Sequence, residues 1–350
     1  MDLTIRASDN LSGSIAIPSN KSHSFRALIM ASLASGESII RNPAISNDWR
    51  LGVAAMHQFG ATVADLGEGV WRVTGVSGKP RTPDAEIDCG NSGILLRFLA
   101  AVASKCGGEV TLTGDHSLQH IRLCQPMLDA INDLGGSAAS TKGDGHAPIV
   151  VHGSITGGTI HMPGLDSQPV SAAIIAACLA DVDSEIVVDE PGETPWVGMT
   201  LEWLARCGAS VSHDDYRRYR VSGQTVWRGF DVTIPLDWSA ALYPVVAAVV
   251  CPGSEVFVPG VDFEDCQGDR LVLNVLREMG ADIEIRSDGV IARYSPLRGM
   301  AIDCNDFIDQ FMLLAVVGAC AAGETVLTGA EACRHKECDR IAAMAESLGA

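Results

Sequence analysis

Helix-like stretches rich in alanine, leucine and valine alternate along this chain with short runs of β-branched residues. Five of the helix-like stretches end at a glycine, and these glycines recur 69 to 75 residues apart, at Gly60, Gly135, Gly208, Gly280 and Gly349. Glycine suits the position after a helix because it adopts the left-handed conformation without the steric cost of a Cβ atom. The pattern therefore predicts five copies of a helix–turn–strand segment.

A second feature repeats with the same period. A glutamate opens a β-branched strand every 69 to 76 residues, at Glu37, Glu109, Glu185, Glu255 and Glu324. Two features with one period indicate an internal repeat. Strands that alternate with two amphipathic helices in each copy are typical of an α/β fold, here with mixed α+β character.

Length and charge narrow the class of protein. The chain has 350 residues, which is enough for about two domains at roughly 100–200 residues each. Its formal net charge of −18 disfavours nucleic-acid binding, because phosphate backbones need a basic surface. If the chain binds a small anion, its few cations must gather at one place.

The N-terminal segment has no long apolar core, so no signal peptide is predicted. No apolar run reaches the roughly 18–20 residues of a membrane span. The 11 cysteines are scattered and never form a Cys-x-x-Cys pair, which is typical of reduced, often buried thiols in a cytoplasmic protein. We therefore expect a cytoplasmic protein with no membrane partner.

One candidate anion site lies at the start of a predicted helix, in the segment from Pro18 to Leu28. Lys21 and Arg26 are five residues apart in this segment, and Ser22 follows Lys21. Helix N–H groups, hydroxyls and cations together suit a phosphate or a carboxylate. A serine-capped helix with solvated charges explains the same residues, so both interpretations stay open.

Two further helix starts have similar features. The glycine-bracketed segment 90–93 precedes an apolar helix, and Asp166 or Ser167 is placed to cap the alanine-rich helix that follows. Capping alone, or an ordinary strand–turn–helix corner, explains these residues without any ligand.

The densest charged cluster is the segment 334–340. Interpreted as a helix, it places Lys336 and Arg340 on one face with Glu337 beside them. A solvated face with a weak ion pair between Glu337 and Arg340 is the alternative. Just upstream, Asp309 opens an apolar run, where a carboxylate also suits helix capping.

A metal face is a weaker hypothesis. His116, His120 and Cys124 are each four residues apart, so one helix would place all three on one side. No further residue confirms a metal site.

The sequence has no Walker loop, Gly-x-Gly-x-x-Gly or Gly-x-Ser-x-Gly motif. Nucleotide hydrolysis, dinucleotide binding and α/β-hydrolase chemistry therefore lack their local signatures.

Taken in order, these segments resemble the EPSP synthase family (3-phosphoshikimate 1-carboxyvinyltransferases) over essentially the whole chain. The run from Lys21 to Arg26 resembles that family's Lys-Ser-x-Ser-x-Arg motif. The segment 90–93 followed by Arg97 resembles its Gly-Asn-(Ala/Ser)-Gly segment. The stretches 114–129 and 336–340 resemble its second substrate loop and its Lys-Glu-(Ser/Thr)-Asp-Arg motif.

The resemblance implies two domains built of βαβαββ units. Carried onto this chain, residues 1–19 and 235–350 form the first domain and residues 20–234 form the second. The family has six units and about five are recognised here. We therefore expect a missing C-terminal unit and poor activity for these 350 residues.

The resemblance also implies a reaction, the transfer of an enolpyruvyl group from phosphoenolpyruvate to the 5-hydroxyl of shikimate 3-phosphate with release of phosphate. Asp309 matches the general base, Glu337 the group that moves the vinyl proton, and Lys21 a contact to both substrates. The implied ligands of shikimate 3-phosphate are Lys21, Ser22, Arg26, Asp166, Ser167, Gln168, Asp309 and Lys336. Those of phosphoenolpyruvate are Lys21, Asn91, Gly93, Arg122, Gln168 and Arg340. No metal or organic cofactor and a monomeric state are implied.

Two acidic residues depart from the family pattern. Asp166 stands where the family commonly has a phosphate-binding serine, and Glu193 opens a stretch that replaces a Ser-Lys-Pro-Tyr-like sequence. An enolpyruvyl transferase for a different hydroxyl acceptor is therefore an alternative, and a non-catalytic binding remnant is another. The related enzyme that acts on UDP-N-acetylglucosamine is disfavoured, because Ser22 follows Lys21 where that enzyme has asparagine.

Overall fold

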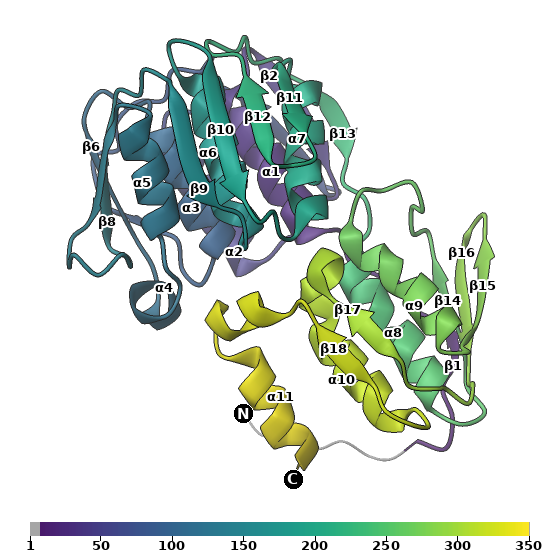
Figure 1. The fold of residues 1–350 in the computed structure, drawn as a ribbon. Coiled ribbons are helices and arrows are strands. Elements are labelled where there is room, and N and C mark those ends of the chain that lie inside the picture. The colour runs from purple at the N-terminus through teal and green to yellow at the C-terminus, as the bar shows by residue number, and fades with distance from the viewer. Residues whose placement is uncertain (1–7, 350) are drawn as a thin grey trace. The chain divides into compact units, whose positions relative to one another are not determined.

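The computed structural model describes residues 8–349. These residues form two compact units (Figure 1). Among the described residues, unit 1 comprises 8–19, 235–334 and 340–349, and unit 2 comprises 20–234 and 335–339. The chain crosses between them near residues 19 and 235. Residues 335–339 group with unit 2 rather than with the C-terminal part, and the assignment of residues 1–19 with 235–350 and of 20–234 to two domains stays a prediction.

Unit 2 is built of helices and strands that follow the predicted repeat. Its helices are α1 (Lys21–Leu33), α2 (Asn47–Gln58), α3 (Gly93–Ala103), α4 (His116–His120), α5 (Gln125–Asp133), α6 (Ser167–Leu179) and α7 (Thr194–Arg206). Its strands are β2 (Glu37–Arg41), β3 (Thr62–Asp65), β4 (Val70–Thr74), β5 (Ile87–Asp88), β6 (Glu109–Thr113), β7 (Ser137–Ser140), β8 (Ile149–His152), β9 (Thr159–Pro163), β10 (Ser184–Asp189), β11 (Val211–Asp214), β12 (Arg218–Val221) and β13 (Asp231–Thr233).

Unit 1 repeats the same elements. Its helices are α8 (Trp238–Val250), η1 (Gly268–Leu271), α9 (Val272–Glu278), η2 (Asn305–Gln310), α10 (Phe311–Cys320) and α11 (Arg340–Gly349), and η3 (Glu331–His335) leads from it into the segment 335–339. Its strands are β1 (Ser12–Ser14), β14 (Glu255–Pro259), β15 (Asp282–Arg286), β16 (Gly289–Arg293), β17 (Ala301–Asp303) and β18 (Val326–Thr328). The predicted α/β class is confirmed.

The sheets share one topology. Written with the parallel pair first, the strand orders are β13-β2-β4-β3, β5-β6-β8-β7, β9-β10-β12-β11 and β1-β14-β16-β15. In each sheet the first pair is parallel and the other two pairs are antiparallel. Helices α3 and α6 supply the crossovers that the parallel pairs β5–β6 and β9–β10 need, and the outer antiparallel pair of each sheet is joined without an intervening helix. Strands β17 and β18 form a further parallel pair.

Strands β1 and β13 each pair with a sheet that is distant from them in the sequence. Strand β1 precedes α1 in the sequence but pairs with β14 of unit 1, whereas β13 precedes α8 but pairs with β2 of unit 2. This exchange is the reason that the chain crosses between the units near residues 19 and 235.

The repeated glycines act as predicted at four places. Gly60, Gly135, Gly208 and Gly280 have φ values of 102°, 90°, 91° and 105°, so each adopts the left-handed conformation after its helix. Gly349 is different, because it is the last described residue and still lies in α11.

The core of unit 2 contains helices that are buried on almost every side. All of α3 is buried, and most residues of α1 and α6 are buried, as expected for helices at the centre of a core. Helices α3 and α6 pack side by side (Figure 1). Because their middle turns are enclosed, polar side chains gather at the helix starts, where the candidate site lies.

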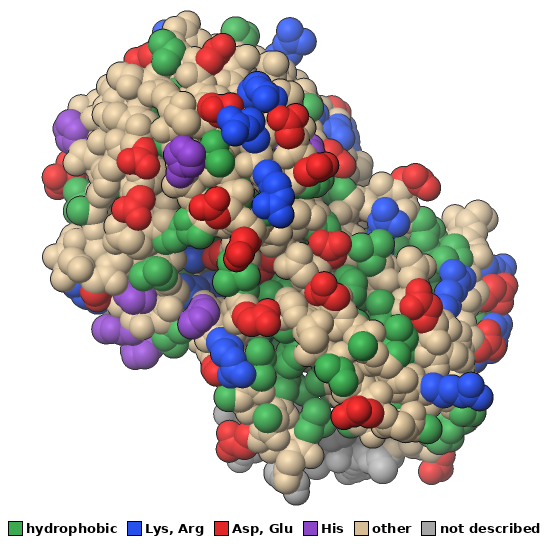
Figure 2. Space-filling view, in the orientation of Figure 1, with side chains coloured by type: hydrophobic (Ala, Val, Ile, Leu, Met, Phe, Trp, Pro, Cys, Tyr) green, Lys and Arg blue, Asp and Glu red, His purple; other side chains and the backbone are tan. Residues whose placement is uncertain are grey.

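Charges of both signs lie on the displayed face of the molecule. Figure 2 shows acidic and basic side chains interspersed over the face it displays. Among residues 8–349, none of the helices combines the length and apolar character that crossing a membrane requires.

Candidate functional site

The starts of three helices carry most of the residues implicated by the sequence in unit 2. Asn20 accepts a hydrogen bond from the backbone N–H of His23 at 2.8 Å at the start of α1. Asp166 accepts one from the backbone N–H of Gln168 at 3.0 Å at the start of α6, and Ser92 is the N-cap of α3. Each cap satisfies one of the helix N–H groups, and the positive end of the helix dipole favours anions beside it.

Arg97 joins the starts of α3 and α6. Its Nη1 donates to Gln168 Oε1 at 2.8 Å, and its Nη2 lies 3.3 Å from Asp166 Oδ2. The Arg97 side chain is only 6% exposed. Burial opposes ionisation of the Asp166 carboxyl, but the charges of Arg97 and Lys336 more than offset it and lower the pKa of Asp166. Asp166 is therefore an ionised carboxylate whose negative charge is balanced by neighbouring cations.

Gly93 leaves room for two guanidinium groups. A Cβ atom at this position would come within 2.8 Å of Arg122 Nη1 and of Arg97 Nη1. Arg122 Nη1 donates to the backbone carbonyl of Asn91 at 3.2 Å, and Arg122 also forms an ion pair with Glu337. The absence of a side chain at Gly93 thus lets both cations lie against the first turn of α3.

A carboxylate, Asp115, holds the amide of Asn91. Asn91 Nδ2 donates to Asp115 Oδ2 at 2.6 Å, and Ser117 donates to the same carboxylate. Burial opposes ionisation, but these hydrogen bonds more than offset it and lower the pKa of Asp115. The loop before α4 is therefore tied to the loop before α3.

Glu193 binds two residues predicted to bind the acceptor. Its Oε2 accepts from Ser167 Oγ at 2.6 Å and from the Ser167 backbone N–H at 3.1 Å. Its Oε1 accepts from Lys336 Nζ at 2.7 Å. The Glu193 side chain is 2% exposed, so this is a buried ion pair at the start of α6.

The segment at the start of α1, from Lys21 to Arg26, is arranged differently from the network around α3 and α6. Lys21 is half-exposed and pairs with Asp48 at 2.6 Å. Arg26 is buried, donates to Thr200 Oγ1 at 2.9 Å and to the Trp196 carbonyl at 3.0 Å, and lies over the ring of Phe98. Ser22 is partly buried, and its carbonyl accepts from Arg26. Arg26 thus binds α7 of its own unit.

Unit 1 contributes a different set of groups. Asp309 in η2 pairs with Arg340 at 2.8 Å. Asp269 in η1 is fully buried and accepts a hydrogen bond from Ser239. Burial and the nearby charge of Asp309 raise the pKa of Asp269 to about 8. Asp269 is therefore protonated at neutral pH.

Two expectations about local structure are wrong. Residues 336–339 are not helical, so Lys336 and Arg340 do not share a helix face. Lys336 and Glu337 instead bind Glu193 and Arg122, and α11 begins only at Arg340. These ion pairs hold the segment in an extended loop.

The proposed metal face is also wrong. Helix α4 ends at His120, and Cys124 is buried at the N-cap of the next helix, α5. His116 and His120 have ring centroids 4.6 Å apart. Within the described residues they form no three-ligand group with Cys124.

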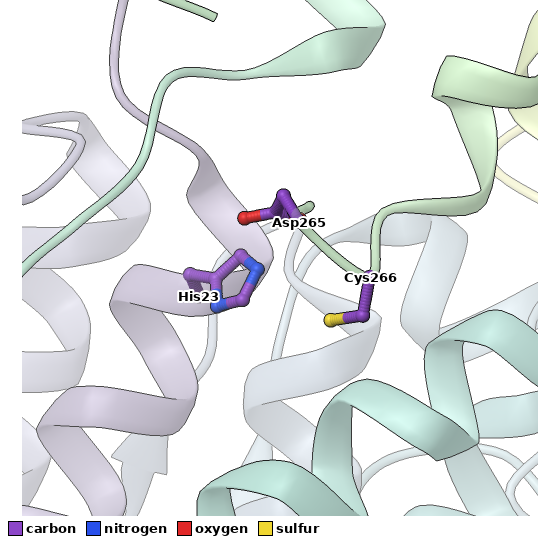
Figure 3. Close-up of side chains that lie close together, drawn as sticks. All are labelled: His23, Asp265 and Cys266. Carbon is purple, nitrogen blue, oxygen red and sulfur yellow. The ribbon is translucent and has the colours of Figure 1, made fainter. Parts of the chain in front are cut away.

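Figure 3 shows His23 in the first turn of α1 and, from the loop between β14 and η1, Asp265 and Cys266. His23 Nδ1 accepts a hydrogen bond from Trp203 Nε1 at 2.9 Å. This bond fixes the ring within unit 2 and places the proton of neutral His23 on Nε2. Asp265 accepts from the backbone N–H of Gln267 at 2.8 Å within unit 1. His23 and Asp265 thus each have a structural role in their own unit.

Sequence reasoning gave no role to Arg97 or Asp269. Arg97 is the one charged residue in the otherwise apolar α3, and a buried cation in such a helix needs a partner, which was a usable signal. Asp269 had none, because its environment is assembled from η1, η2 and the start of α8.

The repeated units of helices and four-stranded sheets define the class of the fold, an α/β protein with cations placed near its helix starts. The family profile described as EPSP synthase (3-phosphoshikimate 1-carboxyvinyltransferase) matches residues 5–350. A 3-phosphoshikimate 1-carboxyvinyltransferase of Ruminiclostridium cellulolyticum is 37% identical over 99% of this chain and 82% of its own length. One from Halobacterium salinarum is 39% identical over 96% of this chain and 79% of its own length. The chain belongs to the EPSP synthase family of transferases.

Solved structures agree with this assignment. The EPSP synthase of Acinetobacter baumannii has a TM-score of 0.79 and 25% identity, covering 97% of this chain and 78% of its own. The enolpyruvyl transferase NikO of Streptomyces tendae shares the fold, with a TM-score of 0.69 and 20% identity, over 91% of this chain and 75% of its own. The family match continues to residue 350, and the chain spans about four fifths of the length of the relatives and solved structures it matches.

Proposed function

We propose that this chain transfers the enolpyruvyl group of phosphoenolpyruvate to the 5-hydroxyl of shikimate 3-phosphate and releases phosphate. The observation that carries the proposal is the connected polar network at the starts of α3 and α6. It gathers the cations Arg97, Arg122 and Lys336 in a protein of net charge −18. Membership of the EPSP synthase family supports the same reaction.

Phosphoenolpyruvate is a small, highly charged anion, and Arg122 suits it. The Arg122 side chain is 7% exposed, and a desolvated guanidinium binds carboxylate or phosphate in a bidentate manner. Gly93 allows the close approach that such binding needs. We assign Lys21, Asn91, Gln168 and Arg340 to the same ligand on the resemblance.

Shikimate 3-phosphate is assigned to the start of α6 and to the cations near it. Ser167 offers a hydroxyl and a helix N–H, and Lys336 offers an ammonium group. These are the donors that a phosphate prefers. Lys21, Ser22, Arg26, Asp166, Gln168 and Asp309 complete the proposed set.

The chemistry requires proton transfers and one exchange of C–O bonds. We assign to Asp309 the removal of the proton from the 5-hydroxyl as its oxygen bonds to C2 of phosphoenolpyruvate. Glu337 gives a proton to C3 and takes one back as the C2–O bond to phosphate breaks. Lys21 stabilises the charge on the departing phosphate.

The test is phosphate release by the purified chain with both substrates, with the product identified by mass. Asp309→Asn removes the base, and we expect the turnover number to fall by about 10²–10⁴-fold. Asp288→Asn, an exposed residue of the β15–β16 turn, is the matched control and should leave turnover unchanged. No product from the folded chain, or full turnover by Asp309→Asn, contradicts the proposal.

Three further properties are proposed on weaker support. We infer that units 1 and 2 are separate domains, that the chain is a monomer and that it acts in the cytoplasm. The two compact units support the first inference, the scattered free cysteines support the third, and the monomeric state rests on the resemblance. Size-exclusion chromatography with light scattering measures the oligomeric state.

A further inference from the structure

Glu193 is an unusual residue at its position. It lies at the N-cap of α7 in the left-handed conformation, with a φ of 49°, yet its side chain makes no capping bond to α7. A non-glycine residue in this conformation carries a steric cost. The side chain is directed instead to the start of α6, where it is almost fully buried.

The groups that Glu193 binds form a set suited to an external anion. They are the Ser167 hydroxyl, the Ser167 backbone N–H at the start of α6 and the Lys336 ammonium group. A helix N–H, a hydroxyl and a cation together suit phosphate. Glu193 therefore occupies, from inside the protein, donors that an incoming phosphate would use.

Simultaneous binding is electrostatically unfavourable. Asp166 already lies beside these donors and depends on Arg97 and Lys336 for its charge compensation. A phosphate added to the Glu193 and Asp166 carboxylates would share Lys336 with both of them. In a partly desolvated site such repulsion is strong.

We propose that Glu193 is an internal competitor for the acceptor's phosphate: its carboxylate holds Ser167 and Lys336 in the empty protein and must release them when the phosphate binds. This inference rests on the proposed function, which assigns Ser167 and Lys336 to shikimate 3-phosphate. It makes Glu193 a specificity-determining residue, because an acceptor without the phosphate does not need to displace it.

The first test is calorimetric titration of Glu193→Gln and Glu193→Ser with shikimate 3-phosphate and, in parallel, with shikimate. We expect the dissociation constant for shikimate 3-phosphate to fall by about tenfold, because no charged hydrogen bond to Lys336 has to be broken. Binding of shikimate should change by less than about threefold. Glu190→Gln, an exposed residue of the same loop, is the matched control and should behave as the unsubstituted chain.

A second probe separates this inference from the proposed function. Inorganic phosphate should raise the thermal midpoint of Glu193→Gln and Glu193→Ser more than that of the unsubstituted chain. If this occurs while no protein binds shikimate 3-phosphate, the internal competitor stands and the proposed acceptor is wrong. If the unsubstituted chain binds shikimate 3-phosphate and the folded variants bind it no more tightly, the inference is overturned. If neither shikimate 3-phosphate nor inorganic phosphate binds any of the folded proteins, both the inference and the proposed function are overturned.

Discussion

Asp166 in unit 2 and Asp269 in unit 1 are carboxyl groups beside helix starts, and their pKa values move in opposite directions. Burial opposes ionisation of both. Arg97 and Lys336 offset it at Asp166, whose pKa is lowered. At Asp269 the nearby charge is that of Asp309, which adds to the effect of burial and raises the pKa to about 8. The sign of the charge brought near a buried carboxyl thus decides its protonation.

The same contrast separates the two sets of candidate residues. In unit 2 the cations Arg97, Arg122 and Lys336 each have a carboxylate close by. Ion pairs of this kind hold the side chains in fixed positions, so an anionic ligand must displace the protein carboxylate to bind the cation. In unit 1 a neutral carboxyl, Asp269, lies near a carboxylate, Asp309, that is paired with Arg340.

The largest expected effect comes from removing the counter-charge of Asp166. Arg97→Met leaves Asp166 without its buried partner and frees Gln168. We expect the free energy of unfolding to fall by about 3 kcal/mol and kcat/KM to fall by about 10²-fold or more. Urea unfolding and steady-state kinetics measure the two.

Lys105→Met is the control for that change, because Lys105 pairs with Asp181 on the surface. Its loss should cost less than about 1 kcal/mol. The double variant Arg97→Met with Asp166→Asn should recover part of the lost stability. Equal losses for Arg97→Met and Lys105→Met would remove the distinction drawn between buried and exposed pairs.

The next effect concerns Asp269. Its folded pKa of about 8 lies above the ordinary value of 3.8, so the folded state holds its proton where the unfolded state has lost it. The stabilisation is complete below about pH 4 and is lost as the pH rises toward 8. Asp269→Asn has no such proton, so we expect its stability relative to the unsubstituted chain to increase by up to about 1.4 kcal/mol for each pH unit between pH 4 and 8.

Urea unfolding of both proteins across that pH range provides the measurement. Asp288→Asn, on the exposed β15–β16 turn, should give a pH profile parallel to that of the unsubstituted chain. Parallel profiles for Asp269→Asn as well would mean that Asp269 ionises normally and that its burial has no electrostatic consequence.

The smallest effect tests the space at Gly93. Gly93→Ala places a methyl group within 2.8 Å of the Arg97 and Arg122 guanidinium groups, and these must move. Because long side chains can shift, we expect only about a tenfold rise in the KM for phosphoenolpyruvate, less than the loss of a full charged hydrogen bond. Steady-state kinetics at saturating shikimate 3-phosphate measure it. Gly107→Ala, where a Cβ meets no atom within 4 Å, is the control, and equal KM values for both variants would contradict this account.

Much of the fold was predictable because it depends on local rules that repeat. The turn glycines Gly60, Gly135, Gly208 and Gly280 have the left-handed conformation that their position after a helix requires. The strand glutamates Glu37, Glu109 and Glu255 open β2, β6 and β14 as predicted. The helix interpretation of residues 336–339 failed because partners distant in sequence, Glu193 and Arg122, bind that segment.

The sequence by itself determined the repeated α/β units, the family and the residue types gathered at the helix starts, because periodicity, turn chemistry and motifs are local properties of a chain. The tertiary structure alone decided which charges meet. Glu193 and Lys336 are 143 residues apart in the chain and 2.7 Å apart in space, and Arg97 reaches Gln168 across 71 residues. Protonation and competition for an anion depend on such distances, since electrostatic interactions act through space and not along the chain.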